Sequence, residues 1–304
     1  MIYRVRHETV YTYEDAVAVS HHIVRLTPRE LAGQHCRESK IGIHPLLDVT
    51  TTTHKDYFGN TVTCFTLPES HNRLSVDATS LLEVHTVPIP DFAASMPWEA
   101  VRDSVQADHS IAGLDAYQFV FDSGRVTASH ALADYARESF TPGRPILEAA
   151  YDLTHRINQD FRFDAKATEV TTPVETFFEK RRGVCQDFSH LQIACMRSLG
   201  LPARYVSGYL RTMPPKGRPR LVGADASHAW CAAWSPAAGN RTPPNGKTSS
   251  GEWVDFDPTN DCIPSDGHIT LAWGRDYSDV SPVQGVLLGG AKHTLEVRVD
   301  VMPL

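Results

Sequence analysis

The sequence of 304 residues contains no run of about 18 apolar residues, so it offers no candidate for a membrane-spanning helix. Basic residues are also few: 29 Lys and Arg stand against 36 Asp and Glu, and we find no concentrated basic face. The resulting net charge of −7 argues against nucleic acid or an acidic membrane as the main partner. The content of 41% hydrophobic and 21% charged residues is typical of a globular protein with a substantial core.

Cysteine is sparse and scattered, and the chain opens without the hydrophobic segment of a signal peptide. The residues from Met1 to His7 alternate between polar and apolar types instead. The spacing of the six cysteines resembles neither a disulfide framework nor a Cys-x-x-Cys site. We therefore expect reduced thiols in a cytoplasmic protein. The cysteines are residues 36, 64, 185, 195, 231 and 262.

Several signatures of cofactor and metal chemistry are missing from the sequence. There is no Gly-x-Ser-x-Gly, no glycine-rich phosphate loop, no His-Glu-x-x-His and no dedicated calcium loop. The 15 histidines are dispersed rather than gathered at metal-ligand spacing. We therefore predict neither a metal site nor a bound cofactor.

The most informative stretch of the sequence runs from Arg182 to Gly200. After Cys185 the apolar residues recur at steps of three and four, which predicts a helix with one buried face. Gly200 is expected to end this helix in a left-handed conformation, and Pro202 prevents its continuation. Gly183 gives the backbone freedom to turn tightly into the first turn. Cys185 is thus predicted at a helix N-terminus, where unpaired N–H groups and the helix dipole favour a thiolate and an oxyanion.

Two later segments could supply the base and the orienting acid that a nucleophilic thiolate needs. Residues 226–234 are typical of a short buried strand with His228 near its start. Residues 252–260 are typical of a second strand, which carries Asp255 and Asp257 and is closed by Pro258. The order Cys, His, Asp on a helix start and two neighbouring strands matches the logic of a cysteine triad. Either aspartate is a candidate for the acid on this pattern.

The chain resembles the transglutaminase-like superfamily, specifically its bacterial branch, in three blocks: Gly-Val-Cys-Gln-Asp-Phe-Ser-His at 183–190, Ser-His-Ala-Trp at 227–230 and Trp-Val-Asp-Phe-Asp-Pro-Thr-Asn at 253–260. The resemblance implies that Cys185 is the nucleophile, His228 the base and Asp257 the acid. Asp257 is chosen because the family's acid lies four residues after the tryptophan, here Trp253. Relatives often carry a glutamate where this chain has Ala232, a departure that bears on substrate binding more than on nucleophilic chemistry.

Strand patterns dominate residues 1–87, which we predict to form an antiparallel β-sandwich domain. Tyr3, Val5 and His7 alternate with polar residues, and Phe58-Gly59-Asn60 is a hairpin signal. The blocks at 26–29 and 56–60 resemble the N-terminal domain of bacterial transglutaminase-like proteins. Nothing in this region suggests catalysis, so we expect it to support the core or to shape substrate access.

Residues 88–144 are interpreted as a connecting segment with a helix, because prolines 88, 90 and 97 interrupt any long element. The helix is expected from about His130 to Phe140, with Ser129 as its cap.

Residues 145–304 are predicted to form the core and the terminal strands. Helices are expected from Pro145 and over 173–181, followed by a strand at 203–210. Residues 213–224 predict a mobile basic loop, and 235–251 predict a long exposed hairpin loop. The alternation at 295–301 predicts a last strand in either the core sheet or the N-terminal domain. The fold class is therefore α+β: a papain-like, transglutaminase-like core with an N-terminal antiparallel β-sandwich domain.

The predicted function is cysteine-dependent hydrolysis of an amide bond through an acyl-enzyme, as in a peptidase or amidase, with a peptide or protein as substrate. The alternatives are transglutaminase-type acyl transfer to an amine, and a catalytically inert binding or scaffold module. We interpret Asp187 as a stabiliser of the first helical turn and His190 as a surface or packing residue. The sequence specifies no oligomeric state. Three cysteines are interpreted as structural: Cys195, Cys231 and Cys262.

Overall fold

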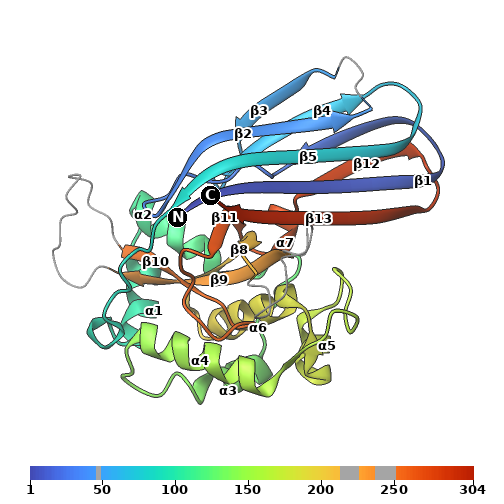
Figure 1. Ribbon diagram of the computed structural model, residues 1–304. Coiled ribbons are helices and arrows are strands. Elements are labelled where there is room, and N and C mark those ends of the chain that lie inside the picture. The colour runs from blue at the N-terminus through green and yellow to red at the C-terminus, as the bar shows by residue number, and fades with distance from the viewer. Residues whose placement is uncertain (46–48, 213–225, 237–250) are drawn as a thin grey trace, which may run out of the picture.

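The computed structural model describes residues 1–45, 49–212, 226–236 and 251–304. Its elements form three layers, with a seven-stranded antiparallel sheet, a four-stranded antiparallel sheet below it and a group of helices beneath both (Figure 1). This arrangement confirms the predicted α+β class. The seven-stranded sheet comprises β1 (Ile2–Val24), β2 (Gln34–His44), β3 (Thr51–Lys55), β4 (Thr61–Leu67), β5 (His71–Val84), β12 (Val283–Gly289) and β13 (His293–Pro303).

The long strand β1 organises this curled sheet. Its first half lies between β5 and β13, and its second half pairs with β4 and β12. The alternation seen in the sequence places Tyr3, Val5, His7 and Thr9 on one buried face, because successive side chains of a strand point to opposite sides. The hairpin between β3 and β4 also forms as predicted, and Gly59 adopts a φ of +74° in its turn.

The C-terminal strands β12 and β13 join the sheet of the N-terminal region. Tyr3 pairs with Pro303 and Tyr13 with His293, so the two chain termini lie side by side (Figure 1). The sequence left open which sheet the terminal strand joins, and β12 and β13 complete the sheet of the N-terminal region. Alternation identifies a strand with one buried face, but it does not specify which sheet that strand joins.

The connecting segment contains more helix than the sequence predicted. Besides α3 (His130–Arg137), which matches the expected helix, it holds α1 (Trp98–Ala107), α2 (Ile111–Tyr117) and the 3₁₀ turns η1 (Phe92–Ala94) and η2 (Gln118–Val120). The prediction of one helix was wrong because Pro97 was interpreted as a loop residue. Pro97 instead stands at the N-cap of α1, where the next turns bury Trp98, Val101 and Val105.

The core places helices beneath a four-stranded sheet in the order β10-β9-β8-β11. The helices α4 and α5 begin directly after Pro145 and Pro173, as predicted.

None of the described helices combines the length and apolar character needed to cross a bilayer. The predicted loops at 213–224 and 235–251 fall on segments outside the described residues, apart from 235, 236 and 251 at strand ends. The remaining elements are α4 (Ile146–Asp160), β6 (Arg162–Phe163), α5 (Val174–Lys180), β7 (Arg182–Gly183), α6 (Cys185–Ser198), β8 (Ala203–Leu210), β9 (Ala226–Pro236), β10 (Gly251–Phe256), β11 (His268–Gly274) and α7 (Tyr277–Val280).

Candidate active site

The central helix α6 begins at Cys185, at the position that the sequence predicted. Gly200 follows its end with a φ of +76°, the left-handed conformation expected of a terminating glycine. The helix is more deeply enclosed than its pattern indicated, because all residues from Gln186 to Arg197 are buried. The four-stranded sheet covers one side and α3, α4 and α5 cover others, so the prediction of a single buried face was too narrow.

Asp187, in the first turn of α6, fixes the backbone that leads into Cys185. Its Oδ2 atom accepts hydrogen bonds from the backbone N–H of Val184 at 2.8 Å and from Oγ1 of Thr168 at 2.6 Å. A Cβ atom on Gly183 would lie 2.4 Å from that same oxygen. Asp187 therefore stabilises the helix start as predicted, and Gly183 permits a close approach rather than an unusual backbone conformation.

The side chains of His228 and Asp257 meet beside this helix start. Nε2 of His228, on β9, lies 2.7 Å from Oδ2 of Asp257, which follows β10. Asp257 is completely buried, and its Oδ1 atom accepts hydrogen bonds from the backbone N–H groups of Thr259 and Asn260. The Asp-Pro-Thr-Asn turn thus holds the carboxylate in one orientation toward the imidazole.

His228 and Cys185 line the same cavity at the start of α6. Because Nε2 is engaged by Asp257, Nδ1 is the ring nitrogen left for the thiol. Burial alone would lower the pKa of His228, but its interactions with Asp257 and Cys185 outweigh it and raise the pKa to about 10. The three residues therefore lie together, and a protonated imidazole would face the sulfur.

The competing acid, Asp255, has a different partner. Its Oδ2 atom accepts a hydrogen bond of 3.0 Å from Nε1 of Trp230. Asp255 lies on β10, two residues before Asp257, yet no hydrogen bond joins it to His228 among the described residues. The geometry thus separates the two aspartates that the residue pattern left equivalent.

His268 is a neighbour of the candidate triad that sequence reasoning missed. It begins β11, outside the three sequence blocks, and its Nε2 lies 3.1 Å from Oδ2 of Asp257. The ligand atoms of His228, Asp257 and His268 all lie within 4.8 Å of one another, a composition that could suit zinc. Both imidazoles, however, approach the same carboxylate oxygen at hydrogen-bond distance, so the arrangement is that of a hydrogen-bonded cluster.

A cavity of about 280 Å³ opens beside Cys185 and His228. One wall comes from the core and the other from the seven-stranded sheet, which contributes His7 and Thr9 of β1 and Leu295 of β13. His7 is held by hydrogen bonds with Thr9 and Tyr209, and burial lowers its pKa to about 4. The N-terminal region therefore shapes the cavity with a neutral, ordered surface.

The other residues singled out in the sequence have packing or backbone roles, and Cys262 pairs with the backbone of Asp257. Burial raises the thiol pKa of Cys195 and Cys231 well above the ordinary range and that of Cys262 to about 11. His190 is buried and packs against Tyr205, with a ring-centroid distance of 5.0 Å. It is a packing residue, one of the two roles the sequence allowed.

Comparison with known families agrees with this architecture. Residues 3–83 match the bacterial transglutaminase-like N-terminal region, and residues 133–258 match the transglutaminase-like superfamily. The chain belongs to the transglutaminase-like superfamily. Both matches fall where the sequence resemblance was noted, in the N-terminal strands and around the three blocks.

Bacterial relatives match the chain over nearly its whole length. An uncharacterised protein of Mycobacterium tuberculosis is 37% identical over 99% of this chain and 92% of its own length. A Mycobacterium leprae protein is 30% identical over 99% of this chain and 98% of its own. A crystal structure from Cytophaga hutchinsonii, described as a candidate cysteine protease, superposes with a TM-score of 0.71 at 19% identity, covering 100% of this chain and 91% of that one. This last match shows a common fold.

Proposed function

We propose that this protein is a cysteine-dependent amide hydrolase in which Cys185 is the nucleophile, His228 the general base and Asp257 the orienting acid. The observation that carries the proposal is the hydrogen bond of 2.7 Å between His228 and Asp257, with Cys185 lining the same cavity as His228 at the start of α6. The raised pKa of His228 supports it, because an imidazolium beside a thiol at a helix N-terminus favours the thiolate.

The proposed reaction follows from the position of each group. The thiolate attacks the carbonyl carbon of an amide, and the N–H of Cys185 stabilises the oxyanion that forms. His228 gives its proton to the leaving amine as the C–N bond breaks, which leaves a thioester on the sulfur. A water molecule then attacks the thioester while His228 takes its proton, and the carboxylic acid departs with the thiolate restored.

A second candidate function is acyl transfer from the thioester to an amine. A Pseudomonas aeruginosa protein-glutamine gamma-glutamyltransferase is 29% identical over 140 residues, which cover 45% of this chain and 19% of that protein. We favour hydrolysis, with a peptide or protein as substrate, because water reaches any solvent-connected site whereas transfer requires a second pocket for the amine. The cavity of about 280 Å³ is compatible with one extended peptide segment.

Brief treatment with near-stoichiometric iodoacetamide at about pH 6, read by intact mass and peptide mapping, tests for the activated thiol. We expect a single rapid label on Cys185 in the wild type and slow labelling after His228→Ala. Cys64 and Cys36, which are also partly exposed, provide internal controls within the same molecule. Equal labelling of Cys185 and these controls would instead favour an inert binding module.

Product analysis separates hydrolysis from transfer. A library of peptide amides is incubated with the protein, with and without an added primary amine, and free acids and amine adducts are resolved by mass. Hydrolysis predicts free acids whose yield the amine does not reduce. Amine adducts that replace the free acids would make acyl transfer the function, and Cys185→Ala should abolish either product.

A further inference from the structure

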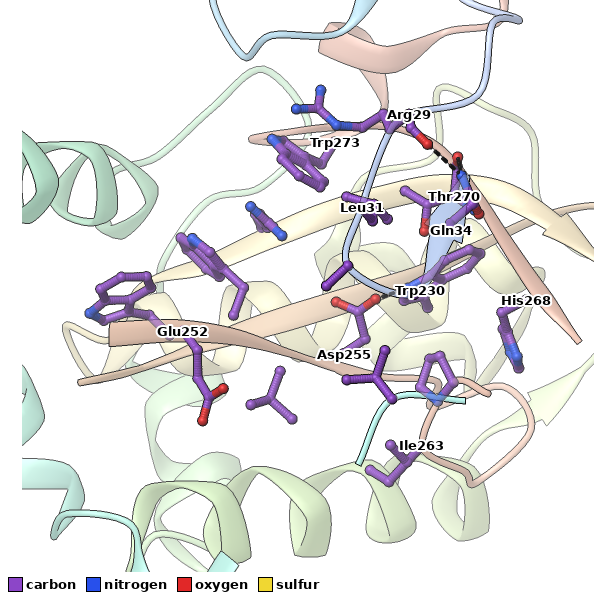
Figure 2. A pocket seen from close by; sticks show the side chains of 18 of the residues that line it. Arg29, Leu31, Gln34, Trp230, Glu252, Asp255, Ile263, His268, Thr270 and Trp273 are labelled. Atoms are coloured by element: carbon purple, nitrogen blue, oxygen red, sulfur yellow. Dashed lines mark hydrogen bonds between the residues drawn. The ribbon is translucent and has the colours of Figure 1, made fainter. Parts of the chain in front are cut away.

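A second and larger cavity, of about 750 Å³, lies between the four-stranded sheet and the segment that leads into β2 (Figure 2). Its walls include Trp234, Trp253 and Trp273 from the core strands, together with Leu31 from the N-terminal region. Pockets with apolar walls at the junction between structural units are frequent ligand sites. Neither Cys185 nor His228 lines this cavity, whereas His268, which contacts Asp257, does. The cavity therefore borders the support of the candidate triad without including its nucleophile or its base.

Arg204 supplies the unusual feature of this cavity. The residue is only 8% exposed, and its guanidinium carbon lies 4.5 Å from the ring centroid of Trp253 and 3.7 Å from that of Trp273. Its Nε atom is buried without a hydrogen-bond partner. Burying a cation with an unpaired N–H donor costs folding free energy. A ligand that supplies the hydrogen-bond acceptor would remove that cost.

The strand register explains why Arg204 does not pair with Asp255. Ala232 on β9 pairs with Arg204 on one side and with Asp255 on the other. The cation and the carboxylate are thus separated by the width of a strand, with the fully buried Ala232 between them, and no ion pair joins them among the described residues. Asp255 instead accepts its hydrogen bond from Trp230.

The charge of the cavity floor also favours an anion. Arg29 lies 3.5 Å from the ring centroid of Trp273. Two guanidinium groups this close to one indole must occupy its opposite faces. The floor of the cavity therefore carries two positive charges, from Arg29 and Arg204, and one negative charge, from Asp255. Asp115 and Glu252 also line the cavity, but they are exposed at its rim, where water and salt screen their charges. One further negative charge would balance the floor.

We propose that this cavity is a binding site for a carboxylate carried on an aromatic or apolar body, with Arg204 as the carboxylate ligand. The planar fork of a guanidinium pairs with the two oxygens of a carboxylate, and both partners are delocalised and flat. The tryptophan rings that cover Arg204 leave its N–H groups as the polar contact and provide the apolar surface for the rest of the ligand. The site goes beyond the proposed hydrolase activity and does not depend on it.

Binding of 3-phenylpropanoate to the wild-type protein, measured by isothermal titration calorimetry, tests the proposal. The neutral analogue 3-phenylpropan-1-ol has the same body and no charge, so we expect it to bind at least about tenfold more weakly. Equal binding of the two compounds would overturn the proposal. Tighter binding of phenyl phosphate than of the carboxylate would overturn the preference for a carboxylate.

Three variants of the protein test where the ligand binds. Arg204→Met should abolish binding, whereas Arg102→Met should leave it unchanged, because Arg102 also packs over a tryptophan ring, that of Trp98, but on α1. Ala232→Glu should also abolish binding, since a glutamate there would stand directly across from Arg204 and take its donors. Unchanged binding in folded Arg204→Met or Ala232→Glu protein would overturn the proposal.

Alkylation of Cys185 distinguishes this site from the active site. Protein blocked by iodoacetamide should bind 3-phenylpropanoate with unchanged affinity, because the cysteine lines the other cavity. Loss of binding on alkylation would place the ligand at Cys185 and overturn the proposal. If Cys185 proves inert in the labelling experiment, the proposed hydrolase function fails, but the proposal of this binding site is unaffected.

Discussion

Nε2 of His268 lies 3.1 Å from Oδ2 of Asp257, the same oxygen that lies 2.7 Å from Nε2 of His228. Burial would raise the pKa of Asp257, but hydrogen bonds with His228, His268 and Asn260 hold it well below the usual range. The acid of the candidate triad is therefore charged and fixed on two sides. The predictions below follow from this cluster and from the helix start beside it.

We expect His268→Leu to lower kcat of amide hydrolysis by about tenfold, because one hydrogen bond that positions Asp257 is lost. KM should stay the same, since His268 does not line the cavity beside Cys185. His268→Gln, which keeps a donor, should restore part of kcat. A change in KM with unaltered kcat would show that His268 acts on substrate binding instead.

Asp257→Asn should lower kcat/KM and the rate of Cys185 labelling by roughly 10²–10⁴, because an amide does not stabilise the imidazolium of His228. Asp261→Asn is the matched control: Asp261 lies in the same turn and forms its hydrogen bond with His155 instead. Its φ of +51° is one that asparagine tolerates well. Similar rates for both variants would contradict the role of Asp257.

The raised pKa of His228 predicts a stability that depends on pH. The pKa in the folded protein, about 10, exceeds the ordinary 6.5, so the protonated form stabilises the fold. This contribution is complete below pH 6.5 and is lost as the pH rises toward 10. The difference in unfolding free energy between the wild type and His228→Gln, from urea denaturation at pH 6, 8 and 10, should therefore shrink. A difference in unfolding free energy that grows from pH 6 to pH 10 would contradict a protonated His228 in the folded protein.

Gly183→Ala should destabilise the fold by about 1–3 kcal/mol, because the new methyl group would meet Oδ2 of Asp187 at 2.4 Å and the ring of Phe177 at 2.7 Å. The displaced helix start should also slow labelling of Cys185. Gly267→Ala is the control, since nothing lies within 4 Å of a Cβ atom there. Thermal unfolding of the two variants measures the difference, and equal midpoints would contradict the packing argument.

The sequence by itself determined the local elements that carry the site. Periodicity located the helix that starts at Cys185, and Gly200 marked its end, because helical packing and left-handed capping leave a pattern within a few residues. Alternation located β1 and the terminal strand in the same way. Asp257 was chosen over Asp255 only through the spacing of a family motif, since both aspartates lie on one short segment.

The tertiary structure alone decided the contacts between distant segments. The partner of β13 is β1, almost 300 residues earlier in the chain, and strand alternation contains no information about that choice. His268 reaches Asp257 through the assembly of the sheet rather than through any motif. Strand register likewise places Arg204 opposite Ala232 rather than opposite a carboxylate. Cross-strand neighbours are fixed by how sheets assemble, so both the support of the candidate triad and the second cavity became visible only in the fold.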